Sequence, residues 1–326
     1  MLKVLSTALS AEEGPHFQIL KDAGVECHVV PRDVNLWDED NLAREIQGYC
    51  GIIAGSEPFT PKVLESSKDL RVISRAGVGF DAVHLETCDR LGIVVATTPG
   101  VNHHSVAEHA ISLLMGIARG FPGYHLDVTG CDWNRMARPR VMGSTLGLVG
   151  LGRIGQATAW RGIGLGMKVI AADPYAPEDF VKEHNIEIVS LDELCARSDY
   201  VSLHSPVTPE TKGMINAETI AKMKDGVALI NTARGQLIIE SDMIDALASG
   251  KIRAAGLDVF EVEPLPSDSP LLTMPNVFMS PHIAGLDCES HADTYAMGAD
   301  TILQLRDGNW PQERIQNLKG VTDWKW

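Results

Sequence analysis

Three side chains in the C-terminal half of the sequence could together handle a carboxylate and a proton. Arg234 and His282 each follow a short apolar run, and Glu263 lies between them in the chain. An arginine binds a carboxylate through two parallel hydrogen bonds. A histidine exchanges a proton near neutral pH, and a carboxylate on its far ring nitrogen stabilises the protonated ring. The three residues therefore indicate hydride chemistry on a hydroxy acid, with Arg234 as substrate clamp, His282 as acid/base and Glu263 as its partner.

Each of these residues also has an ordinary structural explanation. An arginine after a strand can be a surface charge, an acid beside a proline can simply be solvated, and a histidine can satisfy its own loop. Their joint position favours the catalytic interpretation, because Arg234, Asp258 and His282 each end or follow a predicted strand. Ligands of open parallel sheets bind at the carboxyl ends of the strands.

A glycine-rich stretch upstream predicts the cofactor that this chemistry needs. Gly150-Leu-Gly152-Arg-Ile-Gly155 lies between an apolar run and a predicted helix. Gly150 permits a tight turn, Gly152 lets a pyrophosphate approach the backbone, and Gly155 lets helix and strand pack closely. Asp173 ends the next predicted strand, 18 residues after Gly155. An acid there accepts hydrogen bonds from ribose hydroxyls and would repel a 2′-phosphate, so the pattern favours NAD over NADP.

A second glycine loop matches the same fingerprint less well. Gly77-Val-Gly79-Phe-Asp-Ala82 follows a predicted strand and is expected to open a helix. The next predicted strand, however, ends in Ala96-Thr-Thr-Pro99, with no acid for a ribose. We interpret this loop as an anion site for the substrate, with a plain turn as the alternative.

The elements that must position these residues alternate between strand-like and helix-like runs. The first part of the chain contains predicted strands at 3–7, 26–30, 51–54, 71–74 and 93–97 and predicted helices at 11–23, 42–47, 61–66 and 82–91. The second part contains predicted strands at 146–149, 168–172, 187–189, 200–204, 227–232, 254–259 and 277–280 and predicted helices at 154–162, 176–184, 191–198, 217–223 and 241–249. This alternation predicts an α/β fold with two Rossmann-like, doubly wound parallel sheets.

A longer helical pattern separates the two parts. Apolar residues recur at helical spacing between Asn102 and Gly120, and Ser105-Val-Ala-Glu108 matches a capping box. We expect this helix to connect two α/β domains. A final predicted helix at 290–306 is expected to return to the first domain.

Length and composition exclude several classes of protein. A chain of 326 residues is long enough for two domains. A net charge of -15 without a cluster of basic residues argues against a nucleic-acid partner. No run reaches the roughly 18 apolar residues of a membrane-spanning helix. The six cysteines have no metal-site spacing and fit a reducing compartment. With no signal-peptide pattern, we expect a cytoplasmic protein without a metal.

Over essentially its whole length the sequence resembles the D-isomer-specific 2-hydroxyacid dehydrogenases. This family includes phosphoglycerate dehydrogenase, glyoxylate and hydroxypyruvate reductases, and D-lactate dehydrogenase. The motifs that carry the resemblance are Arg75-Ala-Gly-Val-Gly-Phe-Asp81, Ser105-Val-Ala-Glu-His109, Gly150-Leu-Gly-Arg-Ile-Gly155, Asn231-Thr-Ala-Arg-Gly235, Asp258 with Glu263-Pro264, and Ser280-Pro-His-Ile-Ala-Gly285.

The resemblance implies roles for individual residues and an assembly. Catalysis falls to Arg234, Glu263 and His282. The substrate, a small 2-hydroxy or 2-oxo acid, is expected at Ser56, Val78, Gly79, Arg234 and His282. The resemblance places NAD at Gly150, Gly152, Arg153, Ile154, Gly155, Asp173, His204, Ser205, Pro206, Thr211, Thr232, Ala233, Asp258, His282 and Gly285. It implies a discontinuous, flavodoxin-like substrate domain (1–101 and 287–326), an NAD-binding Rossmann domain (102–286), and a homodimer built on the NAD-binding domains.

One loop departs from the family. Phosphoglycerate dehydrogenases that resemble this chain carry an arginine for the substrate phosphate in the loop that here is Gly55-Ser-Glu-Pro58. Glu57 would repel that phosphate, so either Arg75 or Arg138 replaces the missing base or the substrate is not phosphorylated. Glyoxylate, hydroxypyruvate, 3-phosphohydroxypyruvate and branched 2-oxo acids all remain open. Because the chain ends at Trp326, we expect no regulatory extension.

A second class of function also fits a chain of this kind. Some proteins similar to the family are NAD-sensing corepressors, in which the dinucleotide controls assembly rather than catalysis. The intact Arg234, Glu263 and His282, and the lack of disordered tails for partner binding, favour the enzyme.

Overall fold

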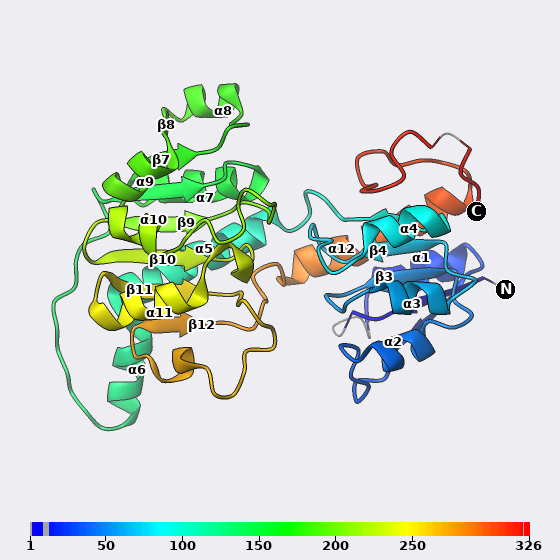
Figure 1. Cartoon of the computed structure of the whole chain (residues 1–326), viewed down its shortest axis with the longest axis horizontal. Helices are drawn as coiled ribbons and strands as arrows, with labels where there is room; N and C mark the ends of the chain where they lie inside the picture. Colours follow the sequence, from blue (N-terminus) through cyan, green and yellow to red (C-terminus); the bar gives the residue numbers. More distant parts are fainter. Residues whose placement is uncertain (1, 9–12, 322) are drawn as a thin grey trace. The chain divides into compact units, whose positions relative to one another are not determined.

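The computed structural model describes residues 2–8, 13–321 and 323–326. The described chain divides into two compact units (Figure 1). Unit 1 comprises Met1–Asn102 and Asp287–Trp326, and unit 2 comprises His103–Leu286. Unit 1 is therefore built from both ends of the chain, and unit 2 is continuous.

The described part of unit 1 contains a five-stranded parallel sheet with the strand order β2-β1-β3-β4-β5. This is the flavodoxin-like order of a doubly wound sheet. The side chains of β3 and β4, which lie inside the sheet, are buried throughout, because helices cover both faces of the sheet. The strands are β1 (Lys3–Ser6), β2 (Glu26–Val29), β3 (Gly51–Ala54), β4 (Val72–Arg75) and β5 (Val94–Ala96).

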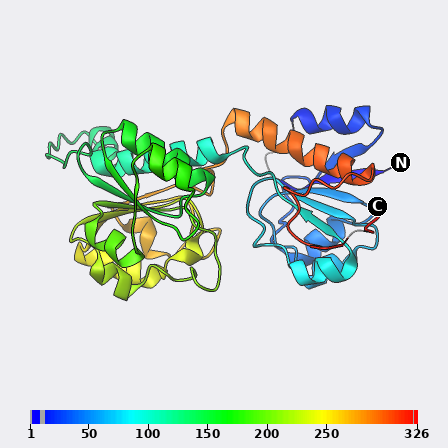
Figure 2. The same ribbon diagram turned by 90° about the horizontal axis from the view of Figure 1, so that it is seen from above.

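Helices lie on both faces of this sheet (Figure 2). On one face α1 (Pro15–Asp22) packs against α12 (Cys288–Arg306), and their apolar residues form one core with the sheet. On the other face lie α2 (Glu39–Glu45), α3 (Pro61–Ser66) and α4 (Leu85–Leu91), which form a second core. The start of the helix predicted at 11–23 lies outside the described residues, since residues 11 and 12 are not described.

The end of the chain completes the edge of this sheet beside β5. Ile315 forms an antiparallel bridge with Ala96. The Asn317 side chain accepts a hydrogen bond from the Val95 amide (2.8 Å) and donates one to the Ile93 carbonyl (2.9 Å). These contacts pair backbone groups that an edge strand would otherwise expose.

The described part of unit 2 contains a seven-stranded parallel sheet with the order β12-β11-β10-β9-β6-β7-β8. The first three strands of the unit run outward in one direction and the next four in the other, so the order reverses between β6 and β9. This is the Rossmann arrangement, in which ligands bind at the reversal point. The strands are β6 (Thr145–Val149), β7 (Lys168–Ala172), β8 (Glu187–Ile188), β9 (Tyr200–Leu203), β10 (Val227–Asn231), β11 (Ile252–Leu257) and β12 (Val277–Met279).

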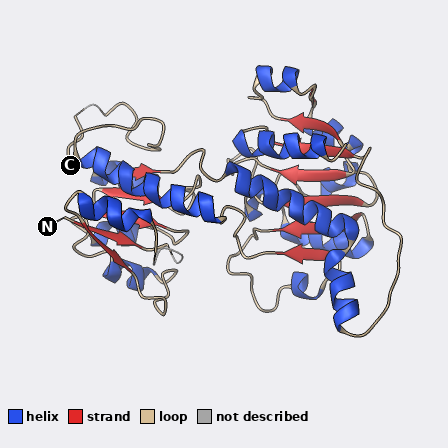
Figure 3. Ribbon diagram, turned by 180° about the vertical axis from the view of Figure 1, so that it is seen from behind, coloured by secondary structure: helices blue, strands red, loops and turns tan. Residues whose placement is uncertain are grey.

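Helices cover both faces of this sheet as well. One core lies under α5 (His103–Arg119), α7 (Arg153–Gly164) and α8 (Glu178–Glu183), and Figure 3 shows α5 and α7 side by side across the strands. The other core lies under α9 (Leu191–Arg197), α10 (Ala217–Lys222) and α11 (Glu240–Ser249). Two short 3-10 turns, η1 (Gly235–Leu237) and η2 (Pro270–Thr273), follow β10 and β11. The prediction of two parallel α/β sheets is confirmed.

A helix that the sequence pattern did not predict follows α5. Gly120 has the left-handed φ of 68° that ends α5, and Pro122 lies in the first turn of α6 (Phe121–Thr129). Residues 131–140 are all exposed and contain no helix or strand. In Figure 1 this segment extends away from the sheet of unit 2.

The predicted capping box at Ser105 is wrong. The helix already begins at His103, and the Ser105 hydroxyl donates to the Ala284 carbonyl (2.8 Å) rather than to the first turn. Glu108 pairs instead with Arg161 of α7 (2.6 Å). A contact distant in sequence thus overrides a local pattern.

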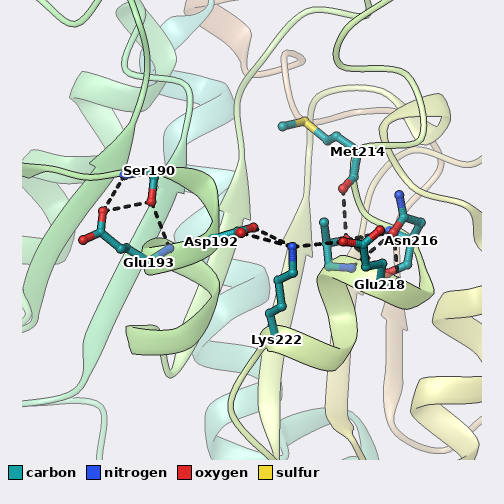
Figure 4. A network of polar contacts seen from close by, with 8 residues as sticks. Ser190, Asp192, Glu193, Met214, Asn216, Glu218 and Lys222 are labelled. Atoms are coloured by element: carbon teal, nitrogen blue, oxygen red, sulfur yellow. Dashed lines mark hydrogen bonds and ion pairs between the residues drawn. The ribbon is translucent and has the colours of Figure 1, made fainter.

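Side chains cap the starts of α9 and α10, and an ion pair joins the two helices (Figure 4). Ser190 and Glu193 form a reciprocal capping box at the start of α9. At the start of α10, the Asn216 side chain accepts hydrogen bonds from the amides of Glu218 (3.1 Å) and Thr219 (3.2 Å). Lys222 of α10 reaches Asp192 of α9 at 3.0 Å. The caps stabilise the start of each helix, and the ion pair joins the two helices to each other.

Candidate active site

The glycine-rich turn after β6 can only be built with glycine at two positions. Gly150 has a φ of 98°, and a Cβ there would lie 2.8 Å from the His204 carbonyl. A Cβ on Gly155 would lie 2.2 Å from the Gly150 carbonyl oxygen. At Gly152, by contrast, no described atom lies within 4 Å of such a Cβ, so the surface of the turn is open. The turn is therefore tight on its inner side and open on its outer side.

Asp173 lies directly beside this turn. One of its carboxylate oxygens accepts a hydrogen bond from the Leu151 amide (2.6 Å), and the other accepts one from the Tyr175 amide (2.7 Å). Gly152 is the N-cap of α7, and among the described residues no side chain caps that helix. An open turn, uncapped N–H groups and an acid at the end of the next strand fit the pyrophosphate and ribose of a dinucleotide.

The segment that follows β9 borders the same turn. The His204 amide and the Ser205 hydroxyl both donate to the Val149 carbonyl, at 2.7 Å and 3.1 Å. Burial lowers the pKa of the His204 imidazole to about 4, so this ring is neutral at pH 7. The Thr211 hydroxyl donates to the Pro206 carbonyl (2.7 Å) and steadies the loop. The structure thus brings His204, Ser205 and Gly150 together.

Asn231, for which the sequence pattern predicted no role, shapes the turn that carries Arg234. Its side chain accepts a hydrogen bond from the Ala233 amide (3.0 Å) and donates one to the Arg234 carbonyl (2.8 Å). A Cβ on Gly235 would lie 1.9 Å from the Phe260 carbonyl, so this turn packs against the chain just before Glu263. The buried Thr232 hydroxyl finds no hydrogen-bond partner within the described residues.

His282 and Glu263 form a direct hydrogen bond. His282 Nδ1 lies 2.7 Å from Glu263 Oε2, and Glu263 Oε1 accepts a hydrogen bond from the Phe260 amide (3.0 Å). Burial alone would raise the pKa of the Glu263 carboxyl, but the hydrogen bond and charge of His282, the Phe260 amide and the charge of Arg234 together lower it. Glu263 is therefore a carboxylate at neutral pH. Because Nδ1 of His282 is engaged, Nε2 is the ring nitrogen that remains for a ligand.

Asp258 lies beneath the loop that carries His282. It is fully buried, and its carboxylate accepts hydrogen bonds from the amides of Ile283 (3.0 Å) and Ala284 (2.8 Å) and from the Ser280 hydroxyl (2.5 Å). Its backbone carbonyl accepts a hydrogen bond from the His282 amide (2.9 Å). Gly285 comes directly after this bonded segment. The geometry gives Asp258 a clear part in holding the loop.

The glycine loop of unit 1 does not open a helix, contrary to expectation. Helix α4 begins at Leu85, and the His84 side chain, not the Gly77 loop, caps it by accepting a hydrogen bond from the Thr87 amide (3.3 Å). Val78 is 41% exposed, and Arg75 donates to the Gly79 carbonyl (3.2 Å). The loop is therefore partly exposed and has no helix dipole behind it.

The loop that departs from the family turns its acid inward. The Glu57 side chain is 2% exposed and accepts hydrogen bonds from the Thr7 hydroxyl and the Gly55 amide. Ser56 is exposed beside it. Arg138, one of the candidate replacement bases, lies over the Tyr124 ring in unit 2, 5.5 Å from its centroid.

The fold and these contacts by themselves define the class of domain. A doubly wound parallel sheet with a glycine turn at its reversal point and an acid after the next strand is a dinucleotide-binding domain of the Rossmann type. The family described as "D-isomer specific 2-hydroxyacid dehydrogenase, NAD binding domain" matches residues 111–284. The chain belongs to the D-isomer specific 2-hydroxyacid dehydrogenase family, and its cofactor is NAD.

Individual relatives agree with this assignment. The D-3-phosphoglycerate dehydrogenase of Mycobacterium tuberculosis is 42% identical over 289 residues, which are 88% of this chain and 54% of that protein. The hydroxypyruvate reductase of Thermotoga maritima is 42% identical over 244 residues, or 73% of this chain and 78% of that protein. The D-lactate dehydrogenase of Aquifex aeolicus, solved with NAD and lactic acid, is 30% identical with a TM-score of 0.83 and covers 96% of this chain and 98% of its own. The chain thus spans only about half the length of the first of these relatives.

No helix in the described part of the chain is both long and apolar enough to cross a membrane.

Proposed function

We propose that the protein is an NAD-dependent D-2-hydroxyacid dehydrogenase that interconverts a small D-2-hydroxy acid and the matching 2-oxo acid. The observation that carries this proposal is the hydrogen bond of 2.7 Å between His282 and Glu263, in the unit that also holds the NAD turn. A histidine paired with a carboxylate is suited to exchange a proton with an alcohol.

Each residue of the proposed site has one task. NAD, when bound, supplies the hydride acceptor or donor for C2 of the substrate. His282 Nε2 takes the hydroxyl proton during oxidation and returns it during reduction. The Glu263 carboxylate stabilises the imidazolium that forms, and the Arg234 guanidinium binds the substrate carboxylate through paired hydrogen bonds.

Further contacts are proposed from the family resemblance and the local geometry. The backbones of Val78 and Gly79, with Ser56, are proposed to contact the substrate. For NAD, the proposal rests on the open turn at Gly152 and on Asp173 beside it. The remaining proposed NAD contacts are Gly150, Arg153, Ile154, Gly155, His204, Ser205, Pro206, Thr211, Thr232, Ala233, Asp258, His282 and Gly285.

A panel assay tests the function and identifies the substrate. Oxidation of NADH is followed by absorbance with glyoxylate, hydroxypyruvate, 3-phosphohydroxypyruvate and a branched 2-oxo acid. His282→Ala is expected to lower kcat by a factor on the order of 10² to 10⁴ on whichever acid turns over. His28→Ala, an exposed histidine of unit 1, is the matched control and should retain activity. Turnover of His282→Ala close to that of the parent protein would contradict the assignment.

The alternative of a non-catalytic NAD sensor gains no support from the comparisons, because the relatives described above are dehydrogenases and a reductase. The same panel separates the two functions, since a sensor would bind NAD without turnover.

We also propose a homodimer built on unit 2, and a cytoplasmic location. Large apolar side chains of α6 and the segment after it are exposed, among them Leu126 at 69% and Trp133 at 76%. Exposed apolar clusters of this kind mark protein contact surfaces. All six cysteines, each in the described part of the chain, are free, as a reducing compartment requires.

A further inference from the structure

One face of α5 packs against β10, β11 and β12, and β12 leads into the candidate catalytic loop. Ser105, His109, Leu113 and Gly116 share this face, because they are three or four residues apart. The apolar half of the face packs as closely as the backbone allows. A Cβ on Gly116 would lie 2.8 Å from the Phe278 ring of β12, and a Cβ on Gly256 of β11 would lie 2.9 Å from the Leu113 Cβ.

The polar half of the same face contacts the loop at 280–284. The Ser105 hydroxyl donates to the Ala284 carbonyl at 2.8 Å. His109 Nε2 lies 2.7 Å from Ser280 Oγ, and Ser280 Oγ lies 2.5 Å from a carboxylate oxygen of Asp258. A serine hydroxyl has a single proton, and an ionised carboxylate only accepts. The Ser280 proton therefore goes to Asp258, and His109 must donate its Nε2–H to Ser280.

The chain of hydrogen bonds ends at the backbone that presents His282. The Asp258 carboxylate holds the Ile283 and Ala284 amides, and its carbonyl holds the His282 amide. His282 itself has a φ of 55°, a conformation that residues other than glycine adopt only where their surroundings enforce it. The loop therefore needs an external support, and α5 supplies it from one side.

We propose that His109 and Ser280 are positioning residues, which fix the Asp258 carboxylate and thereby hold His282 in the backbone conformation that faces Glu263. The expected fall in kcat rests on the proposed function, whereas the support of the loop at 280–286 does not. His109 touches none of the residues of the glycine turn after β6 and reaches the proposed NAD contacts only through Ser280 and Asp258, so we expect its effect to fall more on catalysis than on cofactor affinity.

The experiment compares His109→Ala with His109→Gln. The glutamine side chain keeps an N–H donor near the position of Nε2, and the alanine removes it. Ser280→Ala breaks the same chain at its next member. His104→Ala is the matched control, because His104 is an exposed imidazole of the same helix that contacts Arg161.

Two readouts are taken after thermal unfolding shows that each variant is folded. The first is amide hydrogen exchange in the peptide that covers 280–286. We expect faster exchange there, and not in the strands of unit 2, for His109→Ala and Ser280→Ala. The second is kinetics: both variants should lower kcat by about 10-fold to 100-fold, as a displaced catalytic group does, which is more than they raise the NAD dissociation constant. His109→Gln should recover most of both properties.

The outcomes separate this inference from the proposed function. Unchanged exchange and unchanged kcat in His109→Ala would overturn the positioning role, as would a His109→Gln variant as impaired as His109→Ala. If the parent protein turned over no 2-oxo acid while His109→Ala still showed faster exchange at 280–286, the positioning role would be supported and the dehydrogenase activity would be contradicted.

Discussion

At the scale of single residues, the proposed proton transfer depends on the hydrogen bond of 2.7 Å between His282 and Glu263. The charge and hydrogen bond of His282 lower the pKa of Glu263 against the opposing effect of burial. In the proposed reaction this carboxylate faces the imidazolium that forms, so removal of its charge should lower the rate.

Glu263→Gln tests this dependence. The variant keeps the size of the side chain and removes its charge, so the imidazolium that forms in the proposed reaction loses its charged partner. We expect kcat near neutral pH to decrease by about 10-fold or more. Glu263→Asp keeps the charge and should lower kcat less. A Glu263→Gln variant with the kcat of the parent would rule out a catalytic role for the pair.

The sequence indicates residues whose own side chains or backbone could bind a ligand or exchange a proton. It does not indicate residues such as His109, which act only by holding another residue in place. The tight positions Gly150 and Gly155 follow from glycine geometry, and the structure bears out the close contacts expected there. The His109–Ser280 hydrogen bond joins residues 171 positions apart. Only the packing of α5 on β12 brings them together. The roles proposed for Arg234, Glu263 and His282 stay predictions until they are tested.

At the scale of the elements, helix caps and ion pairs contribute unequally to the stability of α9 and α10. The Asn216 side chain satisfies two amides that the first turn of α10 would otherwise leave without a partner. The ion pair of Lys222 with Asp192 is exposed to solvent, where water screens its energy.

Asn216→Ala should therefore lower the free energy of unfolding by about 1 kcal/mol, the usual cost of a lost N-cap. Lys222→Ala should change it far less. Urea denaturation of the two variants, followed by circular dichroism, measures the difference. If Lys222→Ala proved the more destabilising, the ion pair and not the cap would be what holds α10.

Element positions were predictable where local pattern and tertiary packing agree. Strands β3 and β7 and helix α3 lie at the predicted residues. The prediction failed where a distant contact decides, as at Ser105, whose hydroxyl belongs to the Ala284 loop. Helix α6 was missed because Gly120 and Pro122 indicate an end to α5 equally well whether or not a second helix follows.

At the scale of the whole molecule, the exposed apolar side chains of α6 and its following segment form the surface at which we propose that two copies of the chain meet. Leu126 and Trp133 are more than two-thirds exposed (69% and 76%) and have no role in the cores of unit 2. A second copy of the chain would bury them.

The double variant Leu126→Glu with Trp133→Glu should be monomeric in light scattering after size exclusion, because it places charges in the proposed contact. Tyr175→Glu, also exposed (90%) in unit 2 but outside this segment, is the control and should leave the assembly unchanged. A double variant of the same mass in solution as the parent would place the contact elsewhere or exclude it.

The split of unit 1 between the two ends of the chain sets an order for folding during synthesis. Unit 2 is continuous, so it can fold as soon as Leu286 has left the ribosome. Strands β1 to β5 leave before unit 2, yet the face that α12 covers and the edge that Asn317 pairs stay bare until residues 288–317 have also left. The strands of unit 1 thus reach their native packing only after unit 2 has been made, and during that interval an apolar face of their sheet is open to chaperone binding.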